Sequence, residues 1–260
     1  MLEVVVRGRS RPLRRRLIRD MLAGMADKTN DLTNDLTLEE ARAAAPVLRR
    51  ELGAGKEGRD VARLQSELRR AGLAPGSIDG IFGDRTATAI QEFAVRNALP
   101  APAGVVDAAL WAAILRAGAS AQADAHEAVA RAQEQAAGAP QDAATALQKV
   151  AVDKRAQAQP AGADEEMAAA ALLRAAQQWR AAADSWRAAA TVLAPHADLE
   201  ARGVRAYARQ LRAQDLARSL AARVVNSVAL AGRDLDAGGG TEHRERLAAA
   251  TLTARLLAVE

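Results

Sequence analysis

Alanine makes up about a quarter of this 260-residue chain, whereas aromatic residues account for only 2%. Alanine is the best helix former and its side chain fills little volume, so this bias favours helices that pack closely together. A β-sandwich or a β-barrel would need more β-branched and aromatic residues. The composition therefore predicts an all-α protein.

The positive charge of the chain is concentrated at its N-terminus. The formal net charge is +4, yet residues 1–24 alone carry +5, so the rest of the chain is close to neutral. The arginines of this arm are Arg7, Arg9, Arg11, Arg14, Arg15, Arg16 and Arg19. Such runs are usually solvated, so we predict a disordered arm, which a start at Met21 or Met25 would remove. Nucleic acid or anionic lipid is expected as a partner only through residues 7–19.

The chain lacks the residues that several classes of enzyme need for catalysis. The chain has no cysteine, which excludes disulfides, thiolate metal sites and a cysteine nucleophile. Its three histidines, His126, His196 and His243, do not follow the spacing of a zinc motif, and no Gly-x-Ser-x-Gly occurs. We therefore predict no metal, no cofactor and no catalysis.

Membrane and export signals are not evident. No run of about 18 apolar residues occurs, so no membrane span is predicted. The first six residues have neither the order nor the length of a secretory signal. The expected location stays open between cytoplasmic synthesis with later release or assembly and cell-wall association by another route.

Residues 25–54 are predicted to hold a polar turn and a short helix. The turn is a tandem Asn-Asp-Leu-Thr repeat over 30–37, whose spacing is not that of a calcium-binding EF-hand. Thr37 and Glu40 fit a capping box, so the helix is expected to run over 41–52.

Residues 55–118 have the pattern of a compact unit of three short helices. The first apolar face consists of Val61, Leu64, Leu68 and Ala71. A turn-rich loop over 72–83 follows, and Asp84 and Asp107 are the predicted N-caps of the second and third helices. The core is expected to depend on the rings of Phe82, Phe93 and Trp111.

This stretch resembles the three-helix peptidoglycan-binding domain. The matching pattern is Gly-x-x-Val-x-x-Leu-Gln from Gly58, Asp-Gly-x-Phe-Gly-x-x-Thr from Asp79, Ala-Ile-x-x-Phe from Ala89, and Gly-x-Val-Asp-x-x-Leu-Trp from Gly104. The resemblance covers about a quarter of the chain. It implies a non-catalytic module that attaches a protein to bacterial cell wall, with peptidoglycan as its partner.

The resemblance also suggests candidate ligand-binding residues, which are Asp79, Gly80, Phe82, Gly83 and Trp111. The alternative is that the residues of the 79–83 turn only shape the loop and fill the core. Ala94 and the Pro-containing segment 99–103 depart from the family pattern close to the surface where a glycan would dock.

Residues 119–260 are alanine-rich and predicted to be helical. A helical linker or hairpin is expected over 119–163, with a break at 138–140, and a helical bundle over 164–260. A coiled-coil-like seam is formed by Leu172, Ala176, Trp179, Ala183, Trp186, Ala190 and Leu193. Further helices are expected over about 199–231 and from Thr241. The expected apolar positions there are Val204, Ala208, Leu211, Leu216, Leu220, Val224, Val228, Leu247, Ala250, Leu252, Leu256 and Leu257.

Two tryptophans of this seam, Trp179 and Trp186, are read as core residues or as a contact with a second copy or an assembly partner. A sugar-stacking or membrane-interface stripe is the less favoured reading. The function predicted from the whole chain is cell-wall tethering. The alternatives are a structural component of a phage-tail-like or other large assembly, and an auxiliary part of a wall hydrolase.

Overall fold

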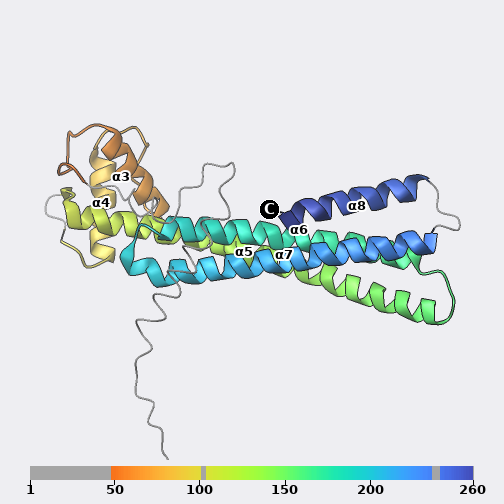
Figure 1. Cartoon of the computed structure of the whole chain (residues 1–260). Helices are drawn as coiled ribbons and strands as arrows, with labels where there is room; N and C mark the ends of the chain where they lie inside the picture. The colour runs from red at the N-terminus through yellow and green to blue at the C-terminus, as the bar shows by residue number, and fades with distance from the viewer. Residues whose placement is uncertain (1–47, 101–103, 236–240, 260) are drawn as a thin grey trace, which may run out of the picture. The chain divides into compact units, whose positions relative to one another are not determined.

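The computed structural model describes residues 48–100, 104–235 and 241–259, and this part of the chain is helical without a regular strand (Figure 1). The helices are α3 (Arg59–Arg70), α4 (Asp84–Arg96), α5 (Ala108–Ala156), α6 (Gly162–Leu193), α7 (Glu200–Leu235) and α8 (Thr241–Val259). A single 3₁₀ turn, Ala197–Leu199, lies between α6 and α7. The predicted all-α class is confirmed.

The N-terminal module is built from α3, α4 and the first turns of α5. Its apolar core includes five side chains that are almost completely buried: Leu64, Ile90, Phe93, Trp111 and Ile114. Two isolated antiparallel bridges close the loops around this core, Leu52 with Val106 and Glu57 with Ile81. The core is therefore shared between three short helical pieces and the loops that connect them.

The predicted helix starts are correct to within a residue. Asp107 caps α5, because its side chain accepts a hydrogen bond from Leu110 N at 2.8 Å. Asp84 is the first residue of α4, and Gly83 occupies the N-cap. The helix predicted over 41–52 falls mostly outside the described residues. Its last five positions, 48–52, are not helical, since Leu52 pairs with Val106 instead.

Helix α5 does not break at residues 138–140, where the sequence predicted a linker break or a hairpin. It continues through Pro140 for 49 residues in total. A proline inside a helix removes one backbone hydrogen bond and crowds the preceding turn. Ala137 and Ala144, on either side of Pro140, are both completely buried. Packing therefore continues across the proline and offsets its local cost.

Alanine forms the contacts between the long helices. In α5, completely buried alanines recur every seven residues, at Ala123, Ala130, Ala137, Ala144 and Ala151. Helix α6 has two such rows, namely Ala168, Ala175, Ala182 and Ala189, and Ala169, Ala176, Ala183 and Ala190. Because these small side chains alternate with a few large buried ones such as Leu172 and Trp186, α6 packs closely on both α5 and α7. Helix α8 packs on α7 and α6 (Figure 1).

The residues of the predicted seam on α6 are buried except for Trp179, which is half-buried. The face predicted for α7 is wrong in part. Val204 is 48% exposed, and α7 turns mainly small residues towards α6. Its buried residues include Ala206, Ala213, Ala217 and Ala221. At Gly203 an added Cβ would lie 3.5 Å from Leu193 Cβ, so the helices already approach closely there. In α8, Leu247 is buried, whereas Leu252 and Leu256 are 63% and 57% exposed, contrary to prediction.

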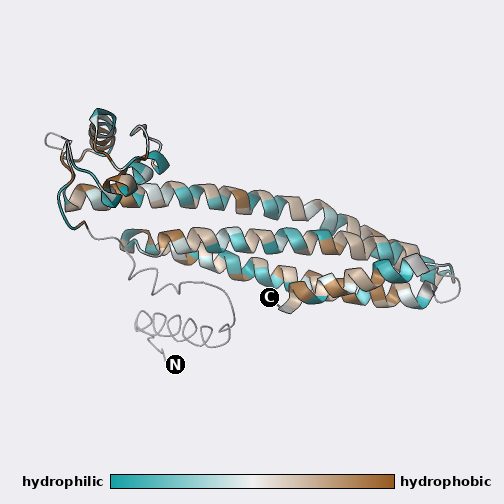
Figure 2. Ribbon diagram, turned by 90° about the horizontal axis from the view of Figure 1, so that it is seen from above, coloured by the Kyte–Doolittle hydropathy of each residue, from teal (hydrophilic) through white to brown (hydrophobic). Residues whose placement is uncertain are grey.

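Hydrophilic and hydrophobic residues alternate along the bundle helices (Figure 2). Within the described ranges, no helix combines the length and the apolar character that crossing a bilayer requires.

Candidate functional site

The loop between α3 and α4, residues 71–83, is held against the chain segment that precedes α3. Gly58 N donates to Gly80 O at 2.9 Å. A Cβ added at Gly80 would lie 2.9 Å from Gly58 O, and the φ angle of Gly80 is +75°. Only glycine fits this approach without strain, because both the space and the backbone conformation exclude a side chain.

The buried amide of Gln65 organises this loop from inside. Gln65 is 1% exposed, and its Oε1 accepts a hydrogen bond from Gly80 N at 3.0 Å. Its Nε2 lies within hydrogen-bond distance of Ile81 O (2.9 Å), Asp79 Oδ1 (3.0 Å) and Thr86 Oγ1 (3.2 Å). An amide nitrogen has two hydrogens to share among these acceptors. One side chain of α3 therefore joins the loop to the start of α4.

Two further contacts fix the ends of the loop. The hydroxyl of Thr86 donates to Pro75 O at 3.1 Å. The carboxylate of Asp79 accepts from Ile81 N at 2.9 Å, and this backbone bond, with the bond from Gln65, lowers the pKa of Asp79 below its ordinary value. Asp79 thus uses one carboxylate oxygen within its own turn.

The structure separates the five predicted ligand-binding residues into two groups. Phe82 and Trp111 are 3% and 4% exposed and belong to the module core, so their ring faces are covered by other side chains. Asp79, Gly80 and Gly83 belong to the turn itself, and Gly83 N donates to Ile81 O at 3.0 Å. Each of the five thus has a structural place in the turn or in the core, and a direct role in ligand binding stays a prediction.

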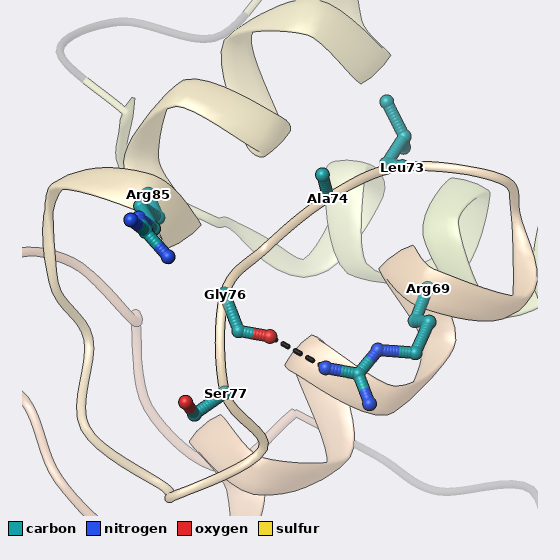
Figure 3. A pocket seen from close by; sticks show the side chains of 6 residues that line it. All are labelled: Arg69, Leu73, Ala74, Gly76, Ser77 and Arg85. Atoms are coloured by element: carbon teal, nitrogen blue, oxygen red, sulfur yellow. Dashed lines mark hydrogen bonds between the residues drawn. The ribbon is translucent and has the colours of Figure 1, made fainter.

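A surface hollow of about 600 Å³ lies beside this loop, between α3 and α4 (Figure 3). Its lining consists of Arg69, Leu73, Ala74, Gly76, Ser77 and Arg85. Arg69 Nη2 donates to Gly76 O at 2.5 Å, and the two arginines lie on either side of Gly76. Sequence reasoning missed this hollow, because single arginines on exposed helix faces carry no motif.

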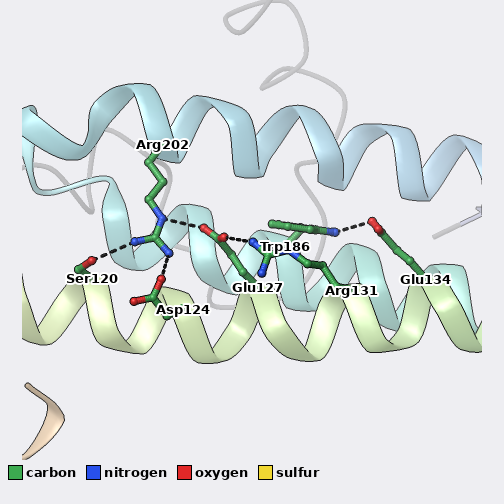
Figure 4. Close-up of polar contacts among 7 residues, drawn as sticks. All are labelled: Ser120, Asp124, Glu127, Arg131, Glu134, Trp186 and Arg202. Carbon is green, nitrogen blue, oxygen red and sulfur yellow. Dashed lines mark hydrogen bonds and ion pairs between the residues drawn. The ribbon is translucent and has the colours of Figure 1, made fainter. Parts of the chain in front are cut away.

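A second polar cluster joins the bundle helices (Figure 4). Arg202 of α7 donates to Glu127 Oε1 at 2.8 Å and to Ser120 Oγ at 2.9 Å, and it also pairs with Asp124. Trp186 of α6 donates to Glu134 Oε1 at 2.7 Å. These groups satisfy one another across three helices, so we assign the cluster to holding the bundle together.

The seam tryptophans lie inside the chain. Trp186 is 2% exposed, and the guanidinium of Arg209 lies 4.7 Å from its ring centre. Trp179 is half-buried and packs against the apolar clusters of α6, α7 and α8. Trp186 therefore acts as a core residue, and its buried ring is not a surface for a second copy.

No group of three or more His, Cys, Asp or Glu side chains gathers as a potential metal site in the ranges that the structure describes.

Comparison with known families places the module in a recognised class. Residues 57–114 match the family model described as "Putative peptidoglycan binding domain". This match confirms the resemblance seen in the sequence and supports cell-wall glycan as a partner. The searches of curated proteins and of solved structures gave no match to this chain.

Proposed function

We propose that this chain is a non-catalytic tether, in which the module of residues 57–114 binds peptidoglycan and the helices that follow form a stiff extension. The observation that supports the first part is the family match over the whole module. The loop that Gln65 and Gly80 hold in place provides an ordered surface for such binding.

The continuity of α5 supports the second part of the proposal. Trp111 near its start belongs to the module core, and Ala151 near its end is completely buried in the bundle. One uninterrupted helix therefore carries the module at one end and the bundle contacts beyond it. Because no loop separates the two parts, a force applied to the bundle is transmitted to the module through helical backbone.

Co-sedimentation of the full chain with purified peptidoglycan sacculi tests the wall binding. We expect the protein in the pellet and no lytic zone when the same preparation is run on a peptidoglycan-containing gel. Protein that stays in the supernatant at all sacculus concentrations would contradict the proposal, and a lytic zone would contradict its non-catalytic part.

A matched pair of glycine variants links the binding to the module. Gly80→Ala places a Cβ 2.9 Å from Gly58 O and should weaken pelleting, because the loop has to move. Gly138→Ala makes the same chemical change in α5, where nothing lies within 4 Å of the added Cβ. It should pellet like the unchanged chain.

A further inference from the structure

We propose that the hollow between Arg69 and Arg85 is the contact point of the module, and that it binds a free carboxylate of the peptidoglycan stem peptide. The inference rests on the proposed wall binding and adds to it the chemical group that is recognised. It is carried by the charge state, the placement and the surroundings of these two arginines.

Among the described residues, Arg69 and Arg85 have no carboxylate partner, as is also true of Arg59 and Arg63, which lie away from the hollow. Other guanidiniums are neutralised by ion pairs, namely Arg50 with Asp60, Arg70 with Glu67, Arg96 with Glu92 and Arg116 with Asp198. Arg69 instead donates to a backbone carbonyl, and no ion pair holds Arg85. The hollow therefore contains two positive charges whose counter-ion must come from outside the described chain.

Gly76 accepts a bond from Arg69 and leaves space for Arg85. Its carbonyl accepts the bond from Arg69 Nη2. A Cβ added at Gly76 would lie 3.3 Å from both Cβ and Cδ of Arg85, so the absence of a side chain leaves room for the stem of Arg85. The two guanidiniums thus start from α3 and α4 and are positioned on either side of one residue (Figure 3). The bond to Gly76 O pre-positions the guanidinium of Arg69, and a pre-positioned donor loses less conformational entropy when a ligand binds.

The rest of the lining suits a peptide end. Ser77 contributes a hydroxyl on the exposed part of the loop, and Ala74 contributes exposed apolar surface above Leu73, which is 6% exposed. Guanidinium groups recognise carboxylates through charge-assisted, often bidentate hydrogen bonds. A short peptide that ends in a small residue and a carboxylate matches this combination of charge and apolar contact.

The module has less surface suited to binding the sugar part of the wall. Sugar rings are commonly bound by stacking on exposed aromatic faces. The module's aromatic side chains in the described ranges are Phe82, Phe93 and Trp111, and they are only 3%, 3% and 4% exposed. Peptidoglycan stem peptides carry free carboxylates, whereas its acetylated amino sugars are uncharged. The charged peptide is therefore the better match to this surface.

The test measures the pelleting of the full chain with sacculi from which phosphodiester polymers have been removed by hydrofluoric acid. Carboxylates are then the anions left on the wall, so this treatment separates them from wall phosphates. A second batch has its free carboxylates converted to methylamides with a water-soluble carbodiimide. We expect binding to the first batch and a loss of at least tenfold in affinity for the second.

The matched variants are Arg69→Gln with Arg85→Gln, and Arg59→Gln with Arg63→Gln. Both pairs remove two positive charges from exposed arginines of the module, but Arg59 and Arg63 do not line the hollow. We expect the first pair to lose at least tenfold in affinity and the second pair to stay within about threefold of the unchanged chain. Circular dichroism and thermal unfolding check that both variants are folded.

The outcomes separate the failure of this inference from the failure of the proposed function. If the unchanged chain pellets and the Arg69 and Arg85 variant pellets equally well, the carboxylate site is refuted and wall binding stands. Equal binding to the amidated sacculi refutes the site in the same way. Binding that disappears after the acid treatment shows that wall phosphates carry the attachment and refutes the carboxylate. If the unchanged chain binds no untreated sacculi, both proposals fail.

Discussion

Replacing Gln65 with methionine tests whether one buried amide holds the loop of residues 71–83 in place. Methionine has a similar length and keeps the apolar contacts of the side chain, but it removes the hydrogen bonds. Gly80 N and Ile81 O then lose partners that lie at 3.0 and 2.9 Å. Two lost bonds cost roughly 1 kcal/mol each, and stranding the buried Gly80 N–H adds about 1–3 kcal/mol. We therefore expect the module to lose about 3–5 kcal/mol of local stability.

Amide hydrogen exchange followed by mass spectrometry measures this loss locally. A loss of 3 kcal/mol corresponds to about 150-fold faster exchange in peptides from α3 and α4. Peptides from the middle of α6 should exchange at an unchanged rate, since α6 makes its main contacts with α5 and α7. Gln91→Met is the control, because Gln91 is an exposed residue of α4 in the same module.

If the amides of the module were as well protected against exchange in Gln65→Met as in Gln91→Met, the Gln65 amide would not hold the loop. An equal rise of exchange in α6 would also contradict the prediction, because the amide would then stabilise the whole chain rather than the loop. Sacculus pelleting of the same variant is expected to fall together with loop protection.

Three further predictions concern the bundle and its junction with the module. Ala182→Leu should lower the free energy of unfolding in urea by about 1–3 kcal/mol or more, because the completely buried methyl group of Ala182 leaves no room between the helices. The control Ala170→Leu, at an exposed position of α6, should change it by less than about 0.5 kcal/mol. Trp186→Phe keeps an aromatic ring but loses the bond to Glu134, so we expect a loss of about 1–2 kcal/mol by the same assay, and an unchanged midpoint would contradict that bond. Burial lowers the pKa of His196 below its ordinary value of 6.5, so the fold favours the neutral form of its imidazole. The contribution of His196 to stability should be complete above pH 6.5 and be lost as the pH falls through the lowered pKa. The urea midpoint of His196→Gln should therefore depend less on pH between pH 7 and 5 than that of the unchanged chain.

The sequence predicted the module correctly because its signals are local. Asp107 caps its helix through a bond to a backbone amide three residues away. The apolar spacing in α3 is a property of one short segment, and Val61, Leu64 and Leu68 are all completely buried as expected. Such patterns act within a few residues, so they do not depend on which other helix packs against them.

The candidate site was predicted less well, because its parts meet only in the folded chain. Asp79 and Gly80 stood out in the sequence, and the structure gives them a place in the turn through contacts with Gln65 and Gly58. Arg69 and Arg85 did not stand out, since nothing in their spacing indicates that they lie on either side of Gly76. Two residues on different helices come together only when the loop between the helices is folded, so their spacing in the sequence does not indicate that they are neighbours.

Alanine content by itself predicted the helical class of the described chain, and cap residues, glycines and prolines predicted where most of its helices begin and end. Tertiary packing decided which face of each helix is buried. Val204 of α7 is exposed while Ala206 and Ala213 are buried, because a close approach to α6 favours the smallest side chain over the most apolar one. Packing on α6 also keeps α5 continuous through Pro140, a residue that by its own preference would end a helix.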